Sequence, residues 1–226
     1  MRRSLRHYAV VLALLLAAAH GAAAQEGPER WEDDIRAFEA ADAAHPVARG
    51  GILFTGSSSI RLWTSLARDF PGLPVINRGF GGSQIHEVTH FAPRVVRPYA
   101  PRLIVLYAGT NDIANGKPVD RAVADVEAFV AAVHATLPNT RIAFISAAPN
   151  PARWHLRQEM QEFNRRVRAY AASDPRLAFI DVWPHMLGAD GLPKPGIFVE
   201  DRLHMNERGY AIWREVVGRF LAEADR

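Results

Sequence analysis

Two spacings of hydrophobic residues alternate along the chain. Short, nearly continuous apolar runs at residues 51–55, 74–77, 103–108, 141–146 and 177–182 are typical of strands buried on both faces. Between them, apolar residues recur at intervals of three and four, which predicts helices over residues 31–44, 57–70, 83–91, 119–137, 156–172 and 206–224. Strands that alternate with helices favour right-handed crossovers and a parallel sheet. We therefore expect one α/β domain, a three-layer α/β/α sandwich around a five-stranded parallel sheet.

The first 24 residues follow a different pattern. Arg2, Arg3 and Arg6 form a cationic start, an apolar run covers residues 8–19, and small residues lead to Ala24. This is the order of a secretory signal peptide, and the apolar run is shorter than the roughly 20 residues that a membrane-spanning helix needs. We expect a signal peptide over residues 1–24, cleavage near Ala24 and an exported domain over residues 25–226 without a stable membrane anchor.

Export changes the interpretation of the charge. The formal net charge is +3, and the predicted signal peptide carries three arginines and no acidic residue, so the mature chain is neutral. A neutral chain gives no electrostatic case for nucleic acid or an anionic membrane as a partner. The chain has no cysteine, which excludes a cysteine nucleophile and thiolate metal sites. Nothing in the sequence indicates an oligomeric state.

Polar and glycine residues gather where the predicted strands end, and parallel sheets bind ligands at that edge. Gly56, Ser57, Ser58 and Ser59 follow the first strand and precede a helix. A serine in such a turn presents its hydroxyl at the sheet edge, beside the backbone N–H groups of a helix N-terminus. The segment predicts either a serine nucleophile or an ordinary helix cap.

Two further loops could supply hydrogen-bond donors. Residues 77–82 are rich in glycine, but a dinucleotide-binding fingerprint would need glycine where the chain has Gln84. Asn111 follows the third strand, within residues 109–112. An asparagine amide in this position can stabilise an oxyanion or can simply form an Asx turn.

The last polar segment precedes the final helix, for which Asn206 is a suitable cap. Asp201 stands three residues before His204, so its carboxylate can orient the imidazole toward a nucleophile. An isolated pair of this kind could equally lie on the surface. Taken together, however, the strand-end segments contain a nucleophile, a base, an orienting acid and oxyanion donors, which predicts a serine hydrolase.

These segments, in this order, resemble the sequence blocks of the SGNH/GDSL hydrolase superfamily. The resemblance runs from about residue 52 to residue 213, and the small members related to platelet-activating-factor acetylhydrolase subunits are closest in layout. It implies a flavodoxin-like fold and a reaction without metal or organic cofactor. The residue roles that it implies are Ser58 as nucleophile, His204 as base, Asp201 as its partner, and the Ser58 N–H, the Gly82 N–H and the Asn111 side chain as the oxyanion hole.

The sequence departs from that pattern at two positions. Ser57 and Ser83 stand where the family usually has aspartate. Neither replacement removes a catalytic group, so both bear on local polarity and substrate preference. The G-x-S-x-G elbow of α/β-hydrolase-type esterases is absent.

Two alternatives compete with the serine hydrolase. His86, Glu87 and His90 spell H-E-x-x-H, which on a helix would suit a zinc-dependent hydrolase, with Glu159 or Glu162 as a third ligand. Pro93 should limit that helix to about two turns. The other alternative is a catalytically dead carbohydrate-binding domain, against which the intact triad residues argue.

We therefore expect an exported esterase that forms an acyl-enzyme on Ser58 and accepts a small-molecule or carbohydrate ester. Acetylated polysaccharide, acetylated peptidoglycan, lysophospholipid and simple esters all fit the residues. Residues 183–202 contain no amphipathic run that could form a lid, which favours short acyl groups. Trp63, Trp154 and Phe198 are the candidates to line the pocket.

Overall fold

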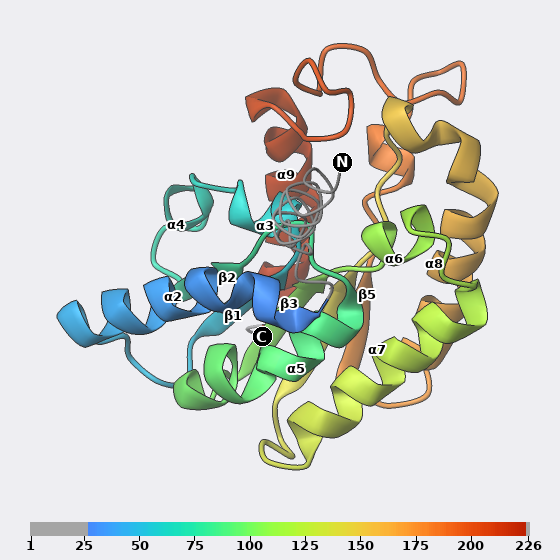
Figure 1. Ribbon diagram of the computed structural model, residues 1–226. Helices are drawn as coiled ribbons and strands as arrows, with labels where there is room; N and C mark the ends of the chain where they lie inside the picture. Colours follow the sequence, from blue (N-terminus) through green and yellow to red (C-terminus); the bar gives the residue numbers. More distant parts are fainter. Residues whose placement is uncertain (1–26, 225–226) are drawn as a thin grey trace, which may run out of the picture.

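A five-stranded parallel sheet forms the centre of the molecule in the computed structural model, which describes residues 27–224. Its strands are β1 (Ile52–Gly56), β2 (Val75–Gly79), β3 (Leu103–Tyr107), β4 (Arg141–Ile145) and β5 (Leu177–Ile180). They lie in the order β2-β1-β3-β4-β5, and every pairing is parallel. The predicted α/β class and the five parallel strands are confirmed (Figure 1).

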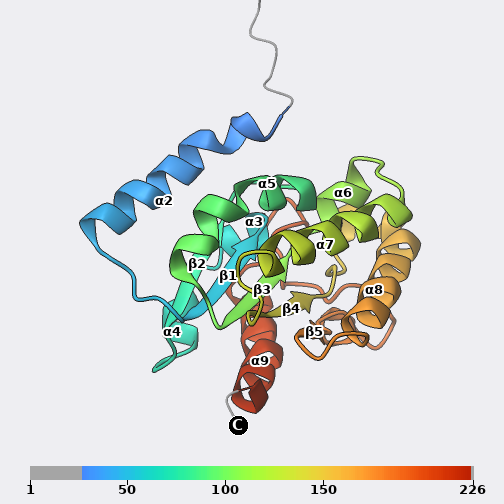
Figure 2. The same cartoon turned by 90° about the horizontal axis from the view of Figure 1, so that it is seen from below.

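Helices cover both faces of this sheet. One face carries α5 (Ile85–Val95), α7 (Val119–His134) and α8 (Arg157–Ala171), with α2 (Glu32–Ala44) against α5. The opposite face carries α3 (Ser58–Arg61), α4 (Leu66–Asp69) and α9 (Glu207–Ala224). Figure 2 shows α5 and α7 on one side of the strands and α9 on the other. The short helix α6 (Thr110–Ala114) follows β3 at the edge where the strands end.

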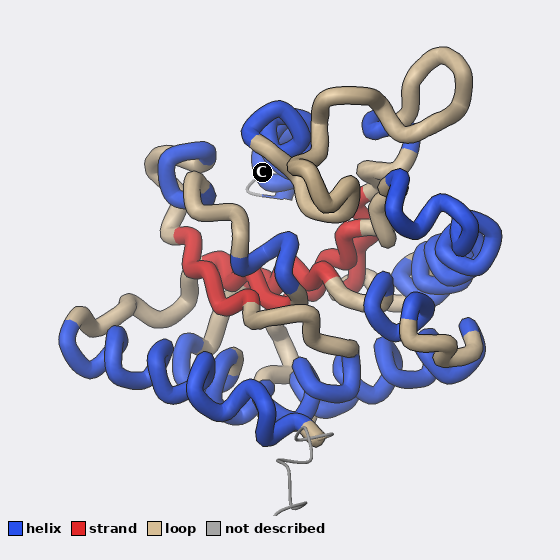
Figure 3. The backbone as a smooth tube through the Cα atoms, turned by 45° about the horizontal axis from the view of Figure 1, so that its top comes forward, coloured by secondary structure: helices blue, strands red, loops and turns tan. Residues whose placement is uncertain are grey.

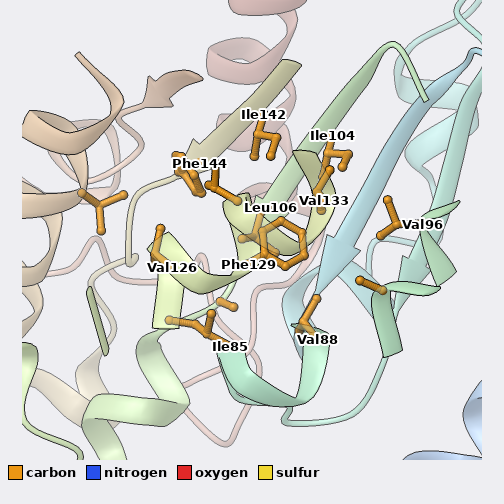
Figure 4. Close-up of a cluster of buried hydrophobic side chains, with 14 of the residues drawn as sticks. Ile85, Val88, Val96, Ile104, Leu106, Val126, Phe129, Val133, Ile142 and Phe144 are labelled. Atoms are coloured by element: carbon orange, nitrogen blue, oxygen red, sulfur yellow. The ribbon is translucent and has the colours of Figure 1, made fainter. Parts of the chain in front are cut away.

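Alternate residues of each central strand enter the two hydrophobic layers. Along β3, Ile104 and Leu106 pack toward α5 and α7, whereas Leu103 and Val105 pack toward α9. Figure 4 shows the first layer, in which Phe129 of α7 lies among strand and helix side chains. Because β1 and β3 are buried at every position, their sequences are almost entirely apolar.

Four 3-10 helices complete the described chain: η1 (Pro28–Trp31), η2 (Arg97–Tyr99), η3 (Pro151–Leu156) and η4 (Pro184–Met186). Long loops connect β5 to α9, and they form the tan arch that rises above the strands in Figure 3. None of the helices in residues 27–224 has the length and apolar character to cross a bilayer. The predicted signal peptide and its cleavage near Ala24 lie outside the described residues.

Two predicted helices differ from those observed. The helix expected over residues 57–70 is broken into α3 and α4, because Trp63 turns inward and its Nε1 donates to Asp69, 2.7 Å away. In contrast, α5 continues past Pro93 to Val95. A proline removes one helical hydrogen bond, and the burial of Phe91 and Val95 offsets that loss.

Candidate active site

Ser58, His204 and Asp201 form one chain of hydrogen bonds. The Ser58 Oγ lies 2.9 Å from Nε2 of His204, and Nδ1 of the same ring lies 2.6 Å from Oδ2 of Asp201. Ser58 begins α3, whereas Asp201 and His204 belong to the turn before α9. His204 lies 146 positions after Ser58 in the sequence. This order of groups lets an imidazole accept a hydroxyl proton while a carboxylate fixes its tautomer.

The Asp201 carboxylate is held by its own turn. The backbone N–H groups of Leu203 and His204 donate to Oδ1 at 2.8 and 2.9 Å, and Arg202, between Asp201 and Leu203, adopts a left-handed φ of 58°. Partial burial opposes ionisation, but the hydrogen bonds from His204 and Leu203 outweigh it and lower the pKa of Asp201 to about 2. The carboxylate is therefore ionised at neutral pH, facing the imidazole.

Gly56 allows the serine turn to lie close to the neighbouring strand. Its φ is +121°, and a Cβ at this position would lie 2.0 Å from the Tyr107 carbonyl oxygen, so a side chain cannot be accommodated. The Ser57 N–H donates to the same oxygen at 2.9 Å. These contacts fix Ser58 at the end of β1, as the sequence predicted for the strand edge.

Asn111 lines the same pocket as His204 and lies beside Gly82. Asn111 is buried, and its Nδ2 donates to the Ser83 carbonyl at 3.1 Å. A Cβ placed on Gly82 would lie 3.7 Å from the same Nδ2, so the two residues are neighbours. The Ser83 hydroxyl is fully buried and makes no hydrogen bond within the described part of the chain.

The pocket between these groups has about 360 Å³ of empty space, including its open mouth. Phe198 lines it, as predicted, together with Ser58, His204 and Asn111. The predictions for Trp63 and Trp154 are wrong. Trp63 is buried in the core on the α9 side, and Trp154 packs against Trp183. Large aromatic side chains near a site are more often recruited to the core, because they bury the largest apolar area.

Comparisons with known proteins agree with this architecture. The GDSL-like lipase/acylhydrolase family model matches residues 48–212. The chain belongs to this family. It is 28% identical over 172 residues to the platelet-activating factor acetylhydrolase IB subunit alpha1 of Pongo abelii, covering 71% of this chain and 70% of that protein. The family match confirms the predicted SGNH/GDSL membership, and this acylhydrolase is a carboxylic ester hydrolase.

Solved structures share the fold. A Streptococcus pneumonia protein proposed to be a platelet activating factor superposes with a TM-score of 0.74 at 22% identity, covering 94% of this chain and 99% of that one. A catalytic mutant of an acetylxylan esterase from Geobacillus stearothermophilus superposes with a TM-score of 0.62 at 16% identity, covering 76% and 94%. Both place the acylhydrolase among proteins with the same α/β/α architecture.

Arg153 is a site residue that the sequence reasoning missed. It lies in η3, and its Nη1 donates to Oδ1 of Asn111 at 2.9 Å and to the Thr110 carbonyl at 3.2 Å. Burial lowers the pKa of the Arg153 guanidinium. The signal that could have found it was its position, because residues after the fourth strand also face the ligand-binding edge.

The 3-10 helix η1 packs against the glycine-rich segment of residues 77–82. The Trp31 ring lies on Gly81, where a Cβ would come within 1.8 Å of a ring carbon, and it packs edge-on against Phe80. Arg30 forms an ion pair of 2.8 Å with Glu87, which also closes the capping box of α5. Residues 27–47 precede the family match, so this support comes from outside it.

A buried charge network lies under the Asn111 loop. Asp112 is fully buried, and both of its oxygens accept from the Ile85 N–H at 3.1 and 3.3 Å. Lys117 donates to Asp112 and, at 2.6 Å, to Asp125. Burial disfavours the ammonium, but its hydrogen bonds with the two carboxylates outweigh burial and raise the pKa of Lys117.

The H-E-x-x-H segment does not assemble a zinc site in the described residues. Its glutamate, Glu87, is buried in the capping box and pairs with Arg30. His86 lies close enough to Asp112 and Asp125 for a shared ion, but the Lys117 ammonium already occupies that space. Within residues 27–224, no cluster of three possible metal ligands includes His90. The pair His86 and His90 therefore lacks the third ligand that a zinc site would need. The alternative ligand Glu162 pairs instead with Arg165 and Arg166.

Proposed function

We propose that this acylhydrolase cleaves esters through an acyl-enzyme on Ser58. The observation that carries the proposal is the hydrogen-bonded chain from Ser58 Oγ through the His204 ring to the Asp201 carboxylate, with distances of 2.9 and 2.6 Å. A nucleophile, a base and an orienting acid in mutual contact satisfy the geometry that acyl transfer requires.

In the first half of the reaction, His204 Nε2 takes the hydroxyl proton as Ser58 Oγ adds to the ester carbonyl carbon. The tetrahedral intermediate then collapses, the bond to the alcohol oxygen breaks, and the imidazolium gives its proton to the departing alkoxide. The ionised Asp201 stabilises that imidazolium. In the second half, His204 takes a proton from water as the water oxygen adds to the acyl carbon. The bond between that carbon and Ser58 Oγ then breaks, the carboxylic acid leaves, and the imidazolium returns its proton to Ser58.

The negative charge on the carbonyl oxygen needs donors that are already in place. We assign this role to the N–H groups of Ser58 and Gly82 and to the Asn111 amide. The proximity of Gly82 to Asn111 Nδ2 supports the assignment. Loss of one such donor typically costs about 10²- to 10³-fold in rate.

The preferred acyl group in this proposal is short, acetyl or butyryl. Two observations support it: the pocket at the triad is small, and two similar proteins are described as an acetylhydrolase and an acetylxylan esterase. Each additional buried methylene is worth only about 0.8 kcal/mol and needs an apolar wall. The alcohol part, a small molecule or a carbohydrate, would face the open mouth.

The decisive experiment is covalent labelling of the purified protein with a fluorophosphonate. We expect the label on Ser58, and Ser58→Ala should lose both labelling and hydrolysis while it stays folded by circular dichroism. Ser57→Ala and Ser59→Ala are matched controls, one residue to either side, that should retain the label. A label on Ser57 or Ser59 would overturn the assignment of the nucleophile.

The acyl preference is tested with p-nitrophenyl esters from acetate to palmitate. We expect kcat/KM to be highest for acetate or butyrate. A steady rise of kcat/KM toward the long chains would contradict the small pocket and favour a lysophospholipid substrate.

Export also belongs to the proposal, on the basis of the signal-peptide pattern in residues 1–24. We expect the full chain, expressed in a secretion-competent bacterium, to be recovered outside the cytoplasm with Gln25 as its first residue. N-terminal sequencing measures this. An intact N-terminus on the cytoplasmic protein would contradict it.

A further inference from the structure

The Asn111 amide can occupy its site in one orientation. An arginine guanidinium only donates hydrogen bonds, so the atom that Arg153 Nη1 contacts at 2.9 Å must be the amide oxygen. A carbonyl only accepts, so the atom that contacts the Ser83 oxygen at 3.1 Å must be the amide nitrogen. Among the residues that the structure describes, this carbonyl is the one acceptor for Nδ2. The second N–H of Nδ2 is therefore available for a substrate oxygen.

The guanidinium that fixes this orientation is unusual for a partly buried cation. Arg153 makes no ion pair with any acidic residue in the range 27–224, although its side chain lines the catalytic pocket. A charge removed from water without a carboxylate partner is costly to a fold. Its hydrogen bonds go instead to the Asn111 amide oxygen and the Thr110 carbonyl.

We propose that Arg153 is a positioning residue that holds and polarises the Asn111 amide as an oxyanion donor. The guanidinium withdraws electron density through the amide oxygen, which makes the Nδ2 hydrogens better donors. It also prevents the amide from rotating to present its oxygen to the developing negative charge. This inference rests on the proposed function, because it assumes that Asn111 Nδ2 stabilises the oxyanion.

The segment that carries Arg153 connects both sides of the pocket. The Arg153 N–H donates to the Asn150 side chain at 2.9 Å, which caps η3 and fixes the start of the arginine side chain. One residue earlier, the Ala152 N–H donates to the carbonyl of Arg202 at 3.1 Å, inside the turn between Asp201 and His204. Residues 150–153 thus connect Asn111 to the turn that carries Asp201 and His204.

A double-mutant cycle tests the proposal, with neutral p-nitrophenyl acetate as the substrate. Arg153→Met should lower kcat roughly ten- to a hundred-fold, the value of one charge-assisted hydrogen bond, with little change in KM. KM should stay nearly constant because the donor acts on the transition state. In the Asn111→Ala background the same substitution should cost less than about threefold, since the group that it positions is gone.

Two further variants keep the result interpretable. Arg153→Lys should recover part of kcat, because an ammonium can donate to the amide oxygen but lacks the planar fork. Arg157→Met removes an exposed arginine from the same region and should leave kcat unchanged. Melting temperatures of all variants show whether the fold is retained, and a lost fold in Arg153→Met shifts the test to Arg153→Lys.

Each outcome has one meaning. The positioning role is wrong if Arg153→Met lowers kcat in the Asn111→Ala background by the same factor as in the wild type. It is also wrong if Arg153→Met raises KM and leaves kcat unchanged. Either result would mean that Arg153 contacts the substrate directly. A wild-type rate for Asn111→Ala alone would instead remove Asn111 from the proposed oxyanion hole. The failure of the inference and the failure of the proposed function are therefore separate results.

Discussion

The two sides of the active-site pocket use very different lengths of chain. On one side, Asp201 and His204 lie three residues apart, and the hydrogen bonds that hold the carboxylate come from their own turn. On the other side, Asn111 is held by Arg153, 42 positions away, and by the carbonyl of Ser83, 28 positions away. The first side is half exposed, whereas Asn111 and Ser83 are buried.

This difference separates catalysis from stability. A self-contained turn near solvent can lose a side chain with little consequence for the core, because few other groups depend on it. The Asn111 loop, in contrast, lies on the buried network of Asp112, Lys117 and Asp125. The removal of one charge from this network leaves another buried charge unpaired. We therefore expect substitutions in the turn to affect rate and substitutions in the network to affect both rate and folding.

His204→Ala should give the largest effect, and it should be confined to rate. The loss of the proposed base should reduce kcat by roughly 10⁴- to 10⁶-fold, the range seen when a triad acts as a unit. The free energy of unfolding should change by less than about 1 kcal/mol, because the ring is partly exposed. Steady-state hydrolysis and urea denaturation measure the two quantities. A loss of several kcal/mol of stability would show that the turn also supports the core.

Lys117→Met should instead lower both the stability and the rate. It leaves the fully buried Asp112 and the neighbouring Asp125 without their cation, and breaking a buried ion pair in this way costs about 3–5 kcal/mol. The urea midpoint should fall, and kcat should fall with it because Asp112 accepts from the backbone at the start of the helix after the glycine loop. Lys194→Met is the control, because the Lys194 ammonium donates to the exposed carbonyl of His185 and pairs with no carboxylate in the described chain. An unchanged midpoint would mean that the network is energetically neutral.

The same difference explains what the sequence could reveal. The Asp201–His204 pair could be predicted because the two residues are three positions apart and bond within one turn. The central strands β1 and β3 could be predicted because burial on both faces makes them continuously apolar. The position of Arg153 after the fourth strand could have placed it at the ligand-binding edge, but nothing in the sequence of residues 150–153 indicates that the arginine contacts Asn111.

Burial also overrode local signals elsewhere. Pro93 predicted a helix end, but the packing of Val95 carries the helix onward. Helical spacing predicted one helix over residues 57–70, but the inward turn of Trp63 divides it. In both cases a tertiary contact with the core decided the local structure, and such contacts are not visible along the chain.

Trp31→Ala should have a moderate effect on rate, although the residue lies outside the family match. Its ring contacts Gly81, and we expect its removal to let the neighbouring Gly82 N–H move away from the proposed oxyanion hole. Small misplacements of catalytic groups are costly, and we expect kcat to fall about tenfold. Phe38→Ala, on the adjoining helix α2, is the control, because its ring packs beneath Arg78 of β2 and not on Gly81. Both variants should lose stability, so an equal kcat for the two would remove the special role of Trp31.

The smallest expected effect is the pH dependence of stability at Asp201. The hydrogen bonds of its turn lower the pKa of this carboxyl to about 2 in the folded protein, below the value of about 3.9 in an unfolded chain. Ionised Asp201 therefore contributes stability that is fully present above about pH 4 and is lost as the pH falls toward about 2. The side chain is 46% exposed, so solvent screening keeps the contribution below about 1 kcal/mol. The difference in unfolding free energy between the wild type and Asp201→Asn should shrink over that window, whereas Glu200→Gln, the same change at the preceding exposed residue, should follow the wild type more closely. If the difference instead persisted unchanged at pH 2, the turn would be stabilised by its backbone geometry and not by the charge, and even the local side of the pocket would depend on packing.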